Sequence, residues 1–292
     1  MICRIVVASE IVLDANKTKV LAARFSRGNN LMATRPISHV VITGASSGLG
    51  AALARAYAGP GVLLTISGRD EARLASVAAD CVAAGAEVAI VICDVTDAQA
   101  MAAWLTSADR ARAVDIVFAN AGIGGKAAMA PWEGESNATA HSMVATNTLG
   151  VINTATPLLP RFVERRRGHL VVISSLAGLL GLPHSPAYCG SKAAAKIYAD
   201  GLRRLMRPHG VRVTVVNPGF IDTPMSRSLP VAGPQTWSAE RAARAVKSAV
   251  AKGKGDFTFP WSLRLAVAAA RLLPNRLVDA VLAKAYSTTT FS

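Results

Sequence analysis

The stretch VVITGASSGLGAALARAYA, residues 40–58, decides the fold of this chain. It begins with four β-branched residues, which favour a strand, and ends in alanine and leucine, which favour a helix. Between them, Gly44, Gly48 and Gly50 form the pattern G-x-x-x-G-x-G. A glycine-rich turn between a strand and a helix lets backbone N–H groups approach a diphosphate, and the helix N-terminus adds positive charge there. The stretch therefore predicts a strand–turn–helix unit that binds a dinucleotide.

Outward from this unit, runs rich in valine and isoleucine alternate with alanine- and leucine-rich stretches. Continuously apolar strands joined by helices are typical of a parallel sheet covered on both faces. We therefore predict an α/β fold: a single-domain, doubly wound (Rossmann) parallel sheet of about seven strands, with its site at their C-terminal ends. The predicted strands are His39–Thr43, Val62–Ser67, Glu87–Cys93, Asp115–Ala119, His169–Ser174, Val211–Val216 and Asp256–Phe259.

Composition bounds the class of protein. The chain has 292 residues, of which 51% are hydrophobic and 17% charged, and this balance excludes a disordered chain. No apolar run reaches the length of a membrane-spanning helix. The four cysteines, Cys3, Cys81, Cys93 and Cys189, are scattered. This spacing gives no metal site and fits a reducing compartment, so we predict a cytoplasmic protein.

The net charge is +14, and +10 of it lies between Arg203 and the C-terminus, from fourteen basic and four acidic residues. Such a surface suits an anionic cofactor, an anionic substrate or an acidic membrane. Nucleic acid is not a predicted partner, because neither a basic helix nor an aromatic stacking motif accompanies the charge.

The two ends of the chain depart from the alternating pattern. Residues 1–31 are predicted to be a non-core extension, or the product of an upstream start codon, because Met32 stands just before the first core strand. A targeting segment is the alternative. Residues 32–260 form the predicted domain. Residues 261–292 are apolar and basic, with a short helix predicted over Leu263–Leu273. Three roles stay open for this segment: covering the substrate pocket, packing in an oligomer, or lying on a membrane surface.

The end of the second strand bears on the choice of nucleotide. A carboxylate there would bond the ribose 2′-hydroxyl of NAD, but Gly68 takes that place and Arg69 follows. An arginine suits a 2′-phosphate through charge-assisted hydrogen bonds. NADP(H) is therefore the predicted cofactor and NAD(H) the alternative. The competing interpretation makes Arg69 an exposed side chain paired with Asp70 or Glu71.

The next two strands also end in residues that suit the crevice. Asp94 and Val95 end the third strand, where they would meet the adenine; Asp94 as an N-terminal cap is the alternative. Asn120, Ala121 and Gly122 form a turn after the fourth strand.

Tyr188 and Lys192 stand four residues apart in a predicted helix, so their side chains lie one turn apart on one face. A neighbouring ammonium favours the phenolate and lowers the pKa of the phenol from about 10. The pair would then exchange protons near neutral pH. Ser175 ends a strand thirteen residues earlier. A solvated tyrosine–lysine pair is the alternative.

In this order, the motifs resemble those of the short-chain dehydrogenases/reductases over roughly residues 39–223. They are Thr43-Gly44-x-x-x-Gly48-x-Gly50, Asp94-Val95, Asn120-Ala121-Gly122, Asn147, Ser175, Tyr188-x-x-x-Lys192 and Pro218-Gly219 with Thr223. One departure is Ala119, where the family often has a second asparagine. The resemblance implies a seven-stranded parallel sheet and reversible hydride transfer between NAD(P)(H) and a carbonyl or alcohol carbon.

The resemblance also implies a role for each residue. Tyr188 exchanges the proton, Lys192 lowers its pKa and bonds the nicotinamide ribose, and Ser175 holds the substrate oxygen. Asn147 binds a water that links Lys192 to solvent; a satisfied buried amide is its alternative. Thr223 bonds the nicotinamide carboxamide. The full set of predicted cofactor contacts is Gly44, Ser46, Ser47, Gly48, Leu49, Gly50, Arg69, Asp94, Val95, Asn120, Ala121, Gly122, Tyr188, Lys192, Pro218, Gly219, Ile221 and Thr223.

Further expectations concern the substrate side and assembly. Ser185 and Pro186 are predicted to start the catalytic helix as its N-cap and first-turn residue. The segment Pro224–Pro234 is predicted to close over a small carbonyl or alcohol substrate. The predicted pocket walls are apolar: Leu179, Leu180, Leu182, Pro183, Met225, Leu229 and Trp237, with His184 beside them. The family implies a homo-oligomer, a dimer or tetramer, through the helices bearing Asn147 and Tyr188.

Four alternative functions stay open. They are an NAD-linked dehydrogenase, an isomerase or epimerase of the extended relatives, a non-catalytic nucleotide-binding regulator, and a reductase of lipid carbonyls held peripherally at a membrane.

Overall fold

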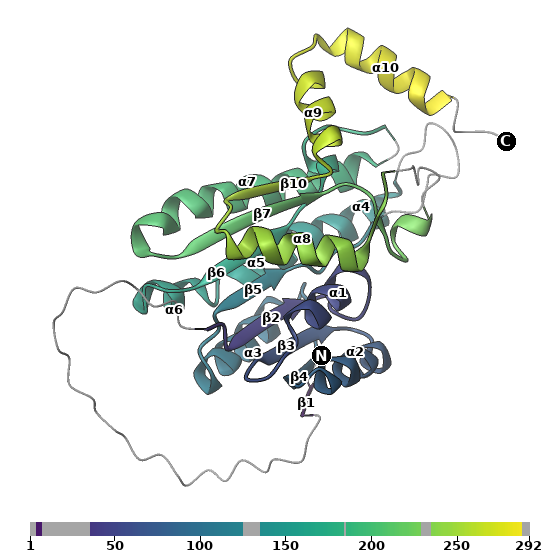
Figure 1. The fold of residues 1–292 in the computed structure, drawn as a ribbon. Helices are drawn as coiled ribbons and strands as arrows, with labels where there is room; N and C mark the ends of the chain where they lie inside the picture. The colour runs from purple at the N-terminus through teal and green to yellow at the C-terminus, as the bar shows by residue number, and fades with distance from the viewer. Residues whose placement is uncertain (1–3, 8–35, 125–134, 184, 229–234, 288–292) are drawn as a thin grey trace, which may run out of the picture.

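The computed structural model describes residues 4–7, 36–124, 135–183, 185–228 and 235–287. Its centre is a sheet in the order β1-β4-β3-β2-β5-β6-β7-β10 (Figure 1). Seven of these strands run parallel, and β1 is antiparallel to β4. The parallel strands are β2 (His39–Thr43), β3 (Leu63–Gly68), β4 (Glu87–Ile92), β5 (Ile116–Ala119), β6 (His169–Ile173), β7 (Arg212–Pro218) and β10 (Asp256–Phe259). The predicted seven-stranded parallel sheet is confirmed, with each strand within two residues of its predicted bounds.

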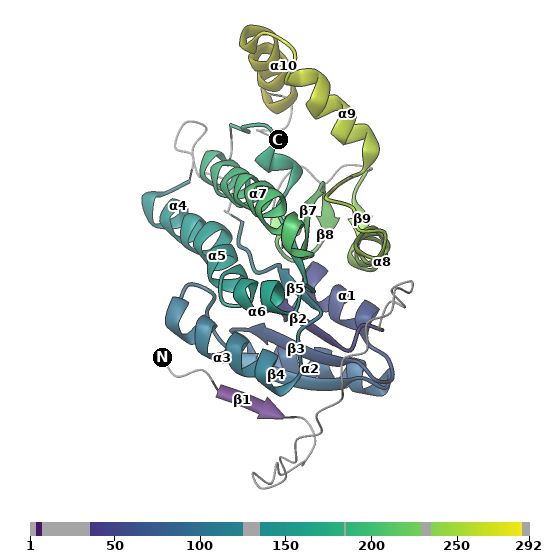
Figure 2. The same ribbon diagram turned by 90° about the vertical axis from the view of Figure 1, so that its left-hand side faces the viewer.

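Helices cover both faces of the sheet, because alternate residues of each buried strand point to opposite sides. Val40 and Ile42 join one apolar core, while Val41 between them joins the other. The first core packs against α1 (Gly48–Tyr57), α2 (Glu71–Ala83) and α8 (Ala239–Ala251). The second packs against α3 (Ala98–Ala111), α5 (Gly150–Ala155), α6 (Leu159–Glu164) and α7 (Pro186–Met206). Figure 2 shows the two helical layers on either side of the strands.

Capping side chains fix where α2, α3 and α8 begin. Asp70 accepts the Arg73 N–H at the start of α2, Asp97 accepts the Ala100 N–H at α3, and Ser238 accepts the Arg241 N–H at α8. Such caps satisfy backbone donors that have no partner within the helix. Asp94 caps no helix; its carboxylate accepts the N–H and hydroxyl of Thr96 in the turn before α3.

Several elements lie outside the predicted set. Arg4–Val7 form the edge strand β1, although residues 1–31 were expected to lie outside the core. The domain boundaries themselves stay a prediction. Strands β8 (Ile221–Asp222) and β9 (Trp237–Ser238) form a second small sheet. The helix expected over Leu263–Leu273 is α9, and it begins and ends earlier. The remaining helices are α4 (Asn137–Val144), α9 (Trp261–Ala270), α10 (Asn275–Ser287), the π-helix η1 (Ala145–Leu149) and the short 3-10 turns η2 (Leu176–Gly178), η3 (Arg207–His209) and η4 (Ser226–Ser228). Among the described residues, no helix has the length and apolarity needed to cross a bilayer.

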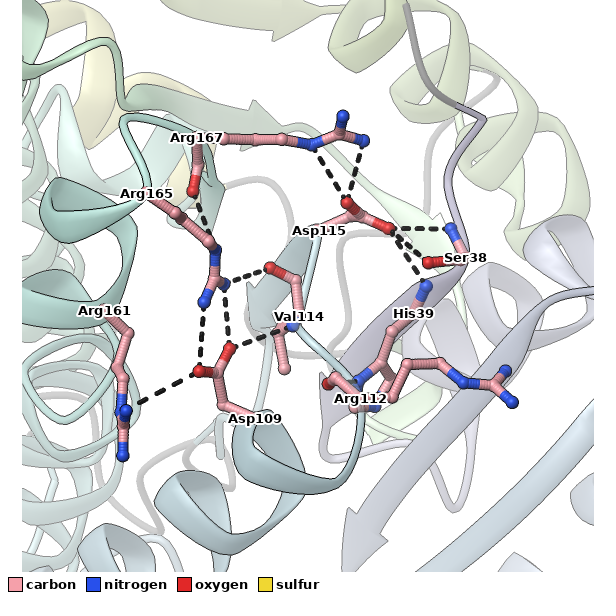
Figure 3. Close-up of polar contacts among 9 residues, drawn as sticks. All are labelled: Ser38, His39, Asp109, Arg112, Val114, Asp115, Arg161, Arg165 and Arg167. Carbon is pink, nitrogen blue, oxygen red and sulfur yellow. Dashed lines mark hydrogen bonds and ion pairs between the residues drawn. The ribbon is translucent and has the colours of Figure 1, made fainter. Parts of the chain in front are cut away.

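Two carboxylates tie the layers together at the edge where the parallel strands begin (Figure 3). Asp115, just before β5, accepts the Ser38 N–H at 2.7 Å and the His39 N–H at 3.2 Å, and it pairs with Arg167 at 2.9 Å. Burial acts to raise the pKa of Asp115, but these hydrogen bonds and Arg167 prevail and hold it below its ordinary value. Asp109 accepts the Val114 N–H and pairs with Arg165 at 2.8 Å.

His169 begins β6 inside the sheet, where its Nε2 lies 2.8 Å from the Thr214 hydroxyl. Burial lowers the pKa of His169 to about 3. The native ring is therefore neutral at pH values where the unfolded ring, with a pKa near 6.5, takes up a proton. The contribution of the neutral His169 ring to the free energy of unfolding is therefore complete above pH 6.5, and it is lost as the pH falls toward 3.

We therefore expect His169→Gln, which keeps an amide for Thr214 but cannot titrate, to flatten the acid limb of the stability curve. Between pH 7 and pH 5 the wild type should lose about 2 kcal/mol more than the variant, since one pKa unit corresponds to about 1.4 kcal/mol. Urea unfolding at each pH measures this difference. His141→Gln, an exposed histidine on α4, is the control and should follow the wild type. Parallel curves for His169→Gln and the wild type would contradict the assignment.

Candidate active site

The turn between β2 and α1 requires its glycines. Gly44 and Gly48 have φ values of +66° and +54°, in the left-handed region that favours glycine. A Cβ on Gly44 would lie 2.6 Å from the Ala121 Cα, and a Cβ on Gly50 would collide with the Gly44 carbonyl. The turn lines a cleft at the C-terminal ends of the strands and leaves backbone exposed there.

Asn120 braces this turn from the end of β5. Its Nδ2 donates to the Thr43 carbonyl at 2.9 Å and to the Gly44 carbonyl at 3.1 Å. The Thr43 hydroxyl accepts the Asn120 N–H at 3.1 Å and donates to the Phe118 carbonyl. Sequence reasoning treated Asn120 only as a cofactor contact. It lines the cleft as predicted, and it also holds the glycine turn in place.

Two arginines stand at the rim of the cleft where the strand ends of β3 and β4 meet. Arg69 pairs with Asp94 at 3.7 Å, not with Asp70 or Glu71. The Arg69 side chain is 68% exposed, so this long ion pair contributes little to stability and leaves the guanidinium available. Arg73, which sequence reasoning missed, also lines the cleft and pairs with Asp70 at 2.9 Å. The one signal for Arg73 that the sequence offered was its position in the first turn of α2.

Ser175, Tyr188 and Lys192 reach the same cleft from β6 and α7. Lys192 is 4% exposed, and its Nζ donates to the Ile173 carbonyl at 3.1 Å and lies 5.9 Å from the Tyr188 ring centroid. Ser175 follows β6, and its Oγ accepts the Ala177 N–H at 3.1 Å. Ser174 donates to the Lys192 carbonyl at 2.8 Å and so fixes α7 against the strand end. The three side chains predicted to share a site are brought together.

Burial sets the direction in which the pKa values of Tyr188 and Lys192 shift. Burial raises the pKa of Tyr188 above its ordinary value, against an opposing hydrogen bond from Ser175. The expected lowering by Lys192 is therefore not what this geometry gives. Burial also lowers the pKa of Lys192 to about 8, because desolvation disfavours its charged form. At neutral pH the phenol keeps its proton and the lysine is mostly charged.

Asn147 lies in the π-helix η1, a wide turn of the kind found at functional sites. Its side chain is fully buried. Oδ1 accepts the Ile123 N–H at 2.8 Å, and Nδ2 donates to the Ile123 carbonyl and to the Ser191 hydroxyl. Ser191 in turn donates to the Tyr188 carbonyl at 2.8 Å. The amide is thus satisfied by protein groups, and its predicted water link to Lys192 stays a prediction.

The loop after β5 can pass close to Lys192 and Asn147 because residue 122 is a glycine. A Cβ on Gly122 would lie 3.0 Å from the Lys192 Nζ and 3.1 Å from the Asn147 Oδ1. A larger residue would therefore push apart the lysine and the asparagine.

The loop after β7 forms the opposite wall. Pro218, Gly219, Ile221 and Thr223 line the cleft as predicted. Ser226, which sequence reasoning missed, holds this loop, because its hydroxyl accepts the Thr223 N–H at 3.0 Å and donates to the Ile221 carbonyl at 2.5 Å. The rest of Pro224–Pro234 from residue 229 onward lies outside the described residues.

The cleft is continuous and large, with a volume of about 860 Å³. Its lining includes the apolar side chains Leu176, Leu180, Leu182, Met225, Leu263 and Val267. Leu263 and Val267 come from α9, so this helix covers the pocket.

Trp237 was predicted as a wall of the substrate pocket, but its ring stacks on Phe259 at 4.6 Å with Arg241 over its other side. Leu229 and His184 lie outside the described residues.

Glu135 caps α7, the helix that carries Tyr188 and Lys192, and sequence reasoning missed this contact. Its two carboxylate oxygens accept the Ala187 N–H at 2.9 Å and the Tyr188 N–H at 3.1 Å. Ser185 stands at the N-cap as predicted, but its side chain makes no capping bond. A carboxylate at a helix N-terminus is also favoured by the helix dipole. Because Glu135 lies 52 residues before Ala187, no local spacing could have shown this contact.

These features fit a nicotinamide dinucleotide. The glycine turn presents backbone where a Cβ would not fit, arginines stand at one rim, and Tyr188 and Lys192 lie farther along the same cleft. Gly44, Gly48, Gly50 and their neighbours would hold the diphosphate, and Arg69 the adenosine end. Among the described residues, no group of three metal-ligating side chains gathers.

Comparison with known proteins agrees with this geometry. The sequence profile described as short chain dehydrogenase matches residues 38–232. An uncharacterized oxidoreductase of Myxococcus xanthus is 37% identical over 252 residues, which cover 85% of this chain and 98% of that protein. A short-chain dehydrogenase/reductase of Burkholderia phymatum, solved with NAD, superposes with a TM-score of 0.71 at 26% identity, covering 79% of this chain and 91% of that one. One from Burkholderia cenocepacia, solved with NADP, has a TM-score of 0.70 at 26% identity, covering 84% and 97%.

Removing the Glu135 carboxylate should loosen the start of α7. We expect Glu135→Ala to lower the free energy of unfolding by about 1–2 kcal/mol, the cost of a lost helix cap. Urea unfolding measures the loss, and Glu135→Gln should restore part of it because one acceptor oxygen remains. Glu164→Ala, an exposed glutamate on α6, is the control and should stay within about 0.5 kcal/mol of the wild type. An equally small effect at Glu135 would contradict the capping role.

Proposed function

Because the chain belongs to the short-chain dehydrogenase/reductase family of NAD(P)-dependent oxidoreductases, we propose that it interconverts an apolar carbonyl compound and its alcohol, with Tyr188 as acid and base. The observation that carries this proposal is that Ser175, Tyr188 and Lys192 face the same cleft as the glycine turn. The apolar side chains in the lining of that cleft support an apolar substrate.

The proton chemistry follows from the environment of Tyr188. A bound nicotinamide would supply or accept the hydride. Because burial raises the pKa of Tyr188, its phenol is protonated at neutral pH and can donate to a carbonyl oxygen that gains negative charge. The charged Lys192 then stabilises the phenolate left behind. Ser175 supplies a hydroxyl to the same oxygen, a stabilisation that strengthens as the charge develops. A protonated tyrosine at neutral pH favours the reductive direction.

Asn147 and Ser191 act on Tyr188 through the backbone. Ser191 bonds both the Tyr188 carbonyl and the Asn147 amide, so the turn bearing Tyr188 is held to the loop after β5. These two residues position the acid and do not touch the substrate. The water link from Asn147 to Lys192 is a further part of the proposal.

The arginines at the rim support NADP(H) over NAD(H). Arg69 and Arg73 both line the cleft, and Gly68 leaves the end of β3 without a carboxylate. Asp94 neutralises part of the Arg69 charge, but the long separation and high exposure make that pairing easy to exchange for a phosphate.

Assembly and location complete the proposal. Val144, Leu149, Ile197 and Leu205 are exposed on α4, η1 and α7, the helices expected to pair in a homo-oligomer. We propose that they form a two-fold interface, in which one apolar patch meets itself. Cys81 and Cys189 are buried free thiols, which suits a reducing cytoplasm.

Tyr188→Phe removes the transferable proton and keeps the ring. We expect kcat to fall at least about a hundredfold, the usual contribution of a general acid, with NADPH affinity within threefold of the wild type. NADPH oxidation with a ketone chosen from a screen of ketones, aldehydes, steroids, sugars and acyl thioesters measures turnover, and fluorescence titration measures affinity. Tyr198→Phe, ten residues farther along α7, is the matched control and should keep its turnover. Near-wild-type turnover of Tyr188→Phe would refute the assignment.

Arg69→Ala tests the choice of cofactor. Losing a charge-assisted bond to a 2′-phosphate should raise the Kd of NADPH about tenfold to a hundredfold and leave that of NADH within threefold. Arg55→Ala, which removes an exposed, ion-paired arginine on α1, controls for the change in net charge. An equal loss of affinity for both nucleotides would count against the proposed contact.

A further inference from the structure

The C-terminal helices expose an unusual amount of apolar surface. Trp261 is 73% exposed and Leu272 87% exposed. Figures 1 and 2 show α9 and α10 standing beyond the edge of the sheet at β10. Large exposed apolar patches mark surfaces that bind a partner. The large apolar side chains exposed here, called the C-terminal patch, are Trp261, Leu265, Leu272, Leu273, Leu277 and Val281.

Helix α9 is apolar on two opposite faces. At about 100° per residue, Leu263 and Val267 share one face, and they line the cleft. Trp261 and Leu265 lie roughly 160° away, and both are exposed. A single helix therefore separates the cavity on one side from the C-terminal patch on the other.

Positive charge borders this patch. Arg264 and Arg271 stand seven residues apart and form a stripe along α9, and Arg276 lies in the first turn of α10. All three are exposed. Asp279 is the acidic residue of the segment between 261 and 283. An apolar face bordered by arginines, with tryptophan at its edge, is typical of helices that lie in the plane of a membrane interface.

The charge pattern distinguishes between two occupants. A second copy of this chain in a two-fold dimer would bring the patch against itself and so place arginines near arginines. Anionic lipid headgroups complement the same arginines, and acyl chains accept the apolar side chains. Helices of 10 and 13 residues are too short to cross a bilayer and suit its surface.

We propose that α9 and α10 dock this protein on an anionic lipid bilayer, with the C-terminal patch inserted among the lipids. Because α9 also walls the cavity, the substrate would be a carbonyl or alcohol compound dissolved in that bilayer. This second statement rests on the proposed oxidoreductase function, and the docking surface does not.

Vesicle co-sedimentation of the full chain tests the docking surface. We expect the protein to sediment with vesicles of phosphatidylcholine containing a third phosphatidylglycerol and to stay in solution with phosphatidylcholine alone. Raising the salt from 0.1 M to 0.5 M should weaken binding, because salt screens the arginines. Equal binding to both vesicle types, or none to the anionic ones, would overturn the proposal.

Matched variants separate a local patch from overall charge. The triple variant Arg264→Gln, Arg271→Gln and Arg276→Gln should lower the partition coefficient about a hundredfold, from about fivefold per arginine. Arg110→Gln, Arg207→Gln and Arg244→Gln remove the same charge from exposed sites on other elements and should lower it less than about threefold. Equal losses in the two triples would show that net charge alone drives binding and would overturn the local patch.

The apolar contribution has its own variant. Leu265→Ser, Leu272→Ser and Leu277→Ser together should also abolish sedimentation, whereas Val82→Ser, an exposed apolar residue on α2, should not. If the leucine variant instead breaks an oligomer in size-exclusion chromatography while the wild type ignores vesicles, the patch is an interface between copies and the proposal fails.

Turnover distinguishes the two statements. With a water-soluble ketone and no vesicles, the wild type and both arginine triples should oxidise NADPH at equal rates. A wild type without this activity refutes the oxidoreductase proposal and leaves the sedimentation result standing. With a ketone carried in anionic vesicles, the C-terminal arginine triple should raise the apparent KM at least tenfold. An unchanged KM would overturn delivery from the bilayer.

Discussion

Strand β5 is fastened to β2 at both ends, and the cleft depends on this double attachment. Asp115, just before β5, bonds the backbone of Ser38 and His39 at the start of β2. Asn120, just after β5, bonds the Thr43 and Gly44 carbonyls at the end of β2. The order of the sheet reverses between these two strands, which is where ligands bind in open α/β sheets. A fixed spacing at this point holds the glycine turn open toward the cleft.

Helix α7, which carries Tyr188 and Lys192, is fixed to the same frame by short polar contacts. Ser174 bonds the Lys192 carbonyl, Ser191 links Tyr188 to Asn147, and Glu135 caps the first turn. On α7 these contacts engage the backbone of Lys192, Tyr188 and Ala187, so they hold the helix without occupying the phenol or ammonium groups. Burial then sets their proton affinities in opposite directions, raising the pKa of Tyr188 and lowering that of Lys192. The exclusion of water from the site strengthens interactions between charges. It also makes an unpaired buried charge costly in free energy.

The sequence was sufficient where local pattern determines structure. The seven parallel strands were predictable because both of their faces are buried, which leaves continuous runs of valine and isoleucine. The placement of Ser175, Tyr188 and Lys192 in one cleft was predictable from their spacing and from the expected ends of strand and helix. Contacts between distant segments were not: the Arg69 partner is the end of the neighbouring strand, and the Glu135 partner is a helix start at Ala187, 52 residues away. The spacing also placed a lysine beside Tyr188, but it gave no sign of the burial that raises the pKa of Tyr188. Trp237 was placed wrongly because an aromatic residue near a predicted loop gives no sign of the Phe259 ring it stacks on.

The two attachments of β5 have a consequence for how the chain acquires its cleft. Ser38 and Asp115 are 77 residues apart, and so are Thr43 and Asn120. The glycine turn is therefore not a self-sufficient local motif, since the amide that braces it arrives only after β3, α2, β4 and α3 have been made. Such distant contacts form slowly, because the intervening chain must lose conformational entropy before the contacts can stabilise it. A nascent chain that has not yet reached residue 120 contains the whole glycine signature but has no means of holding its shape.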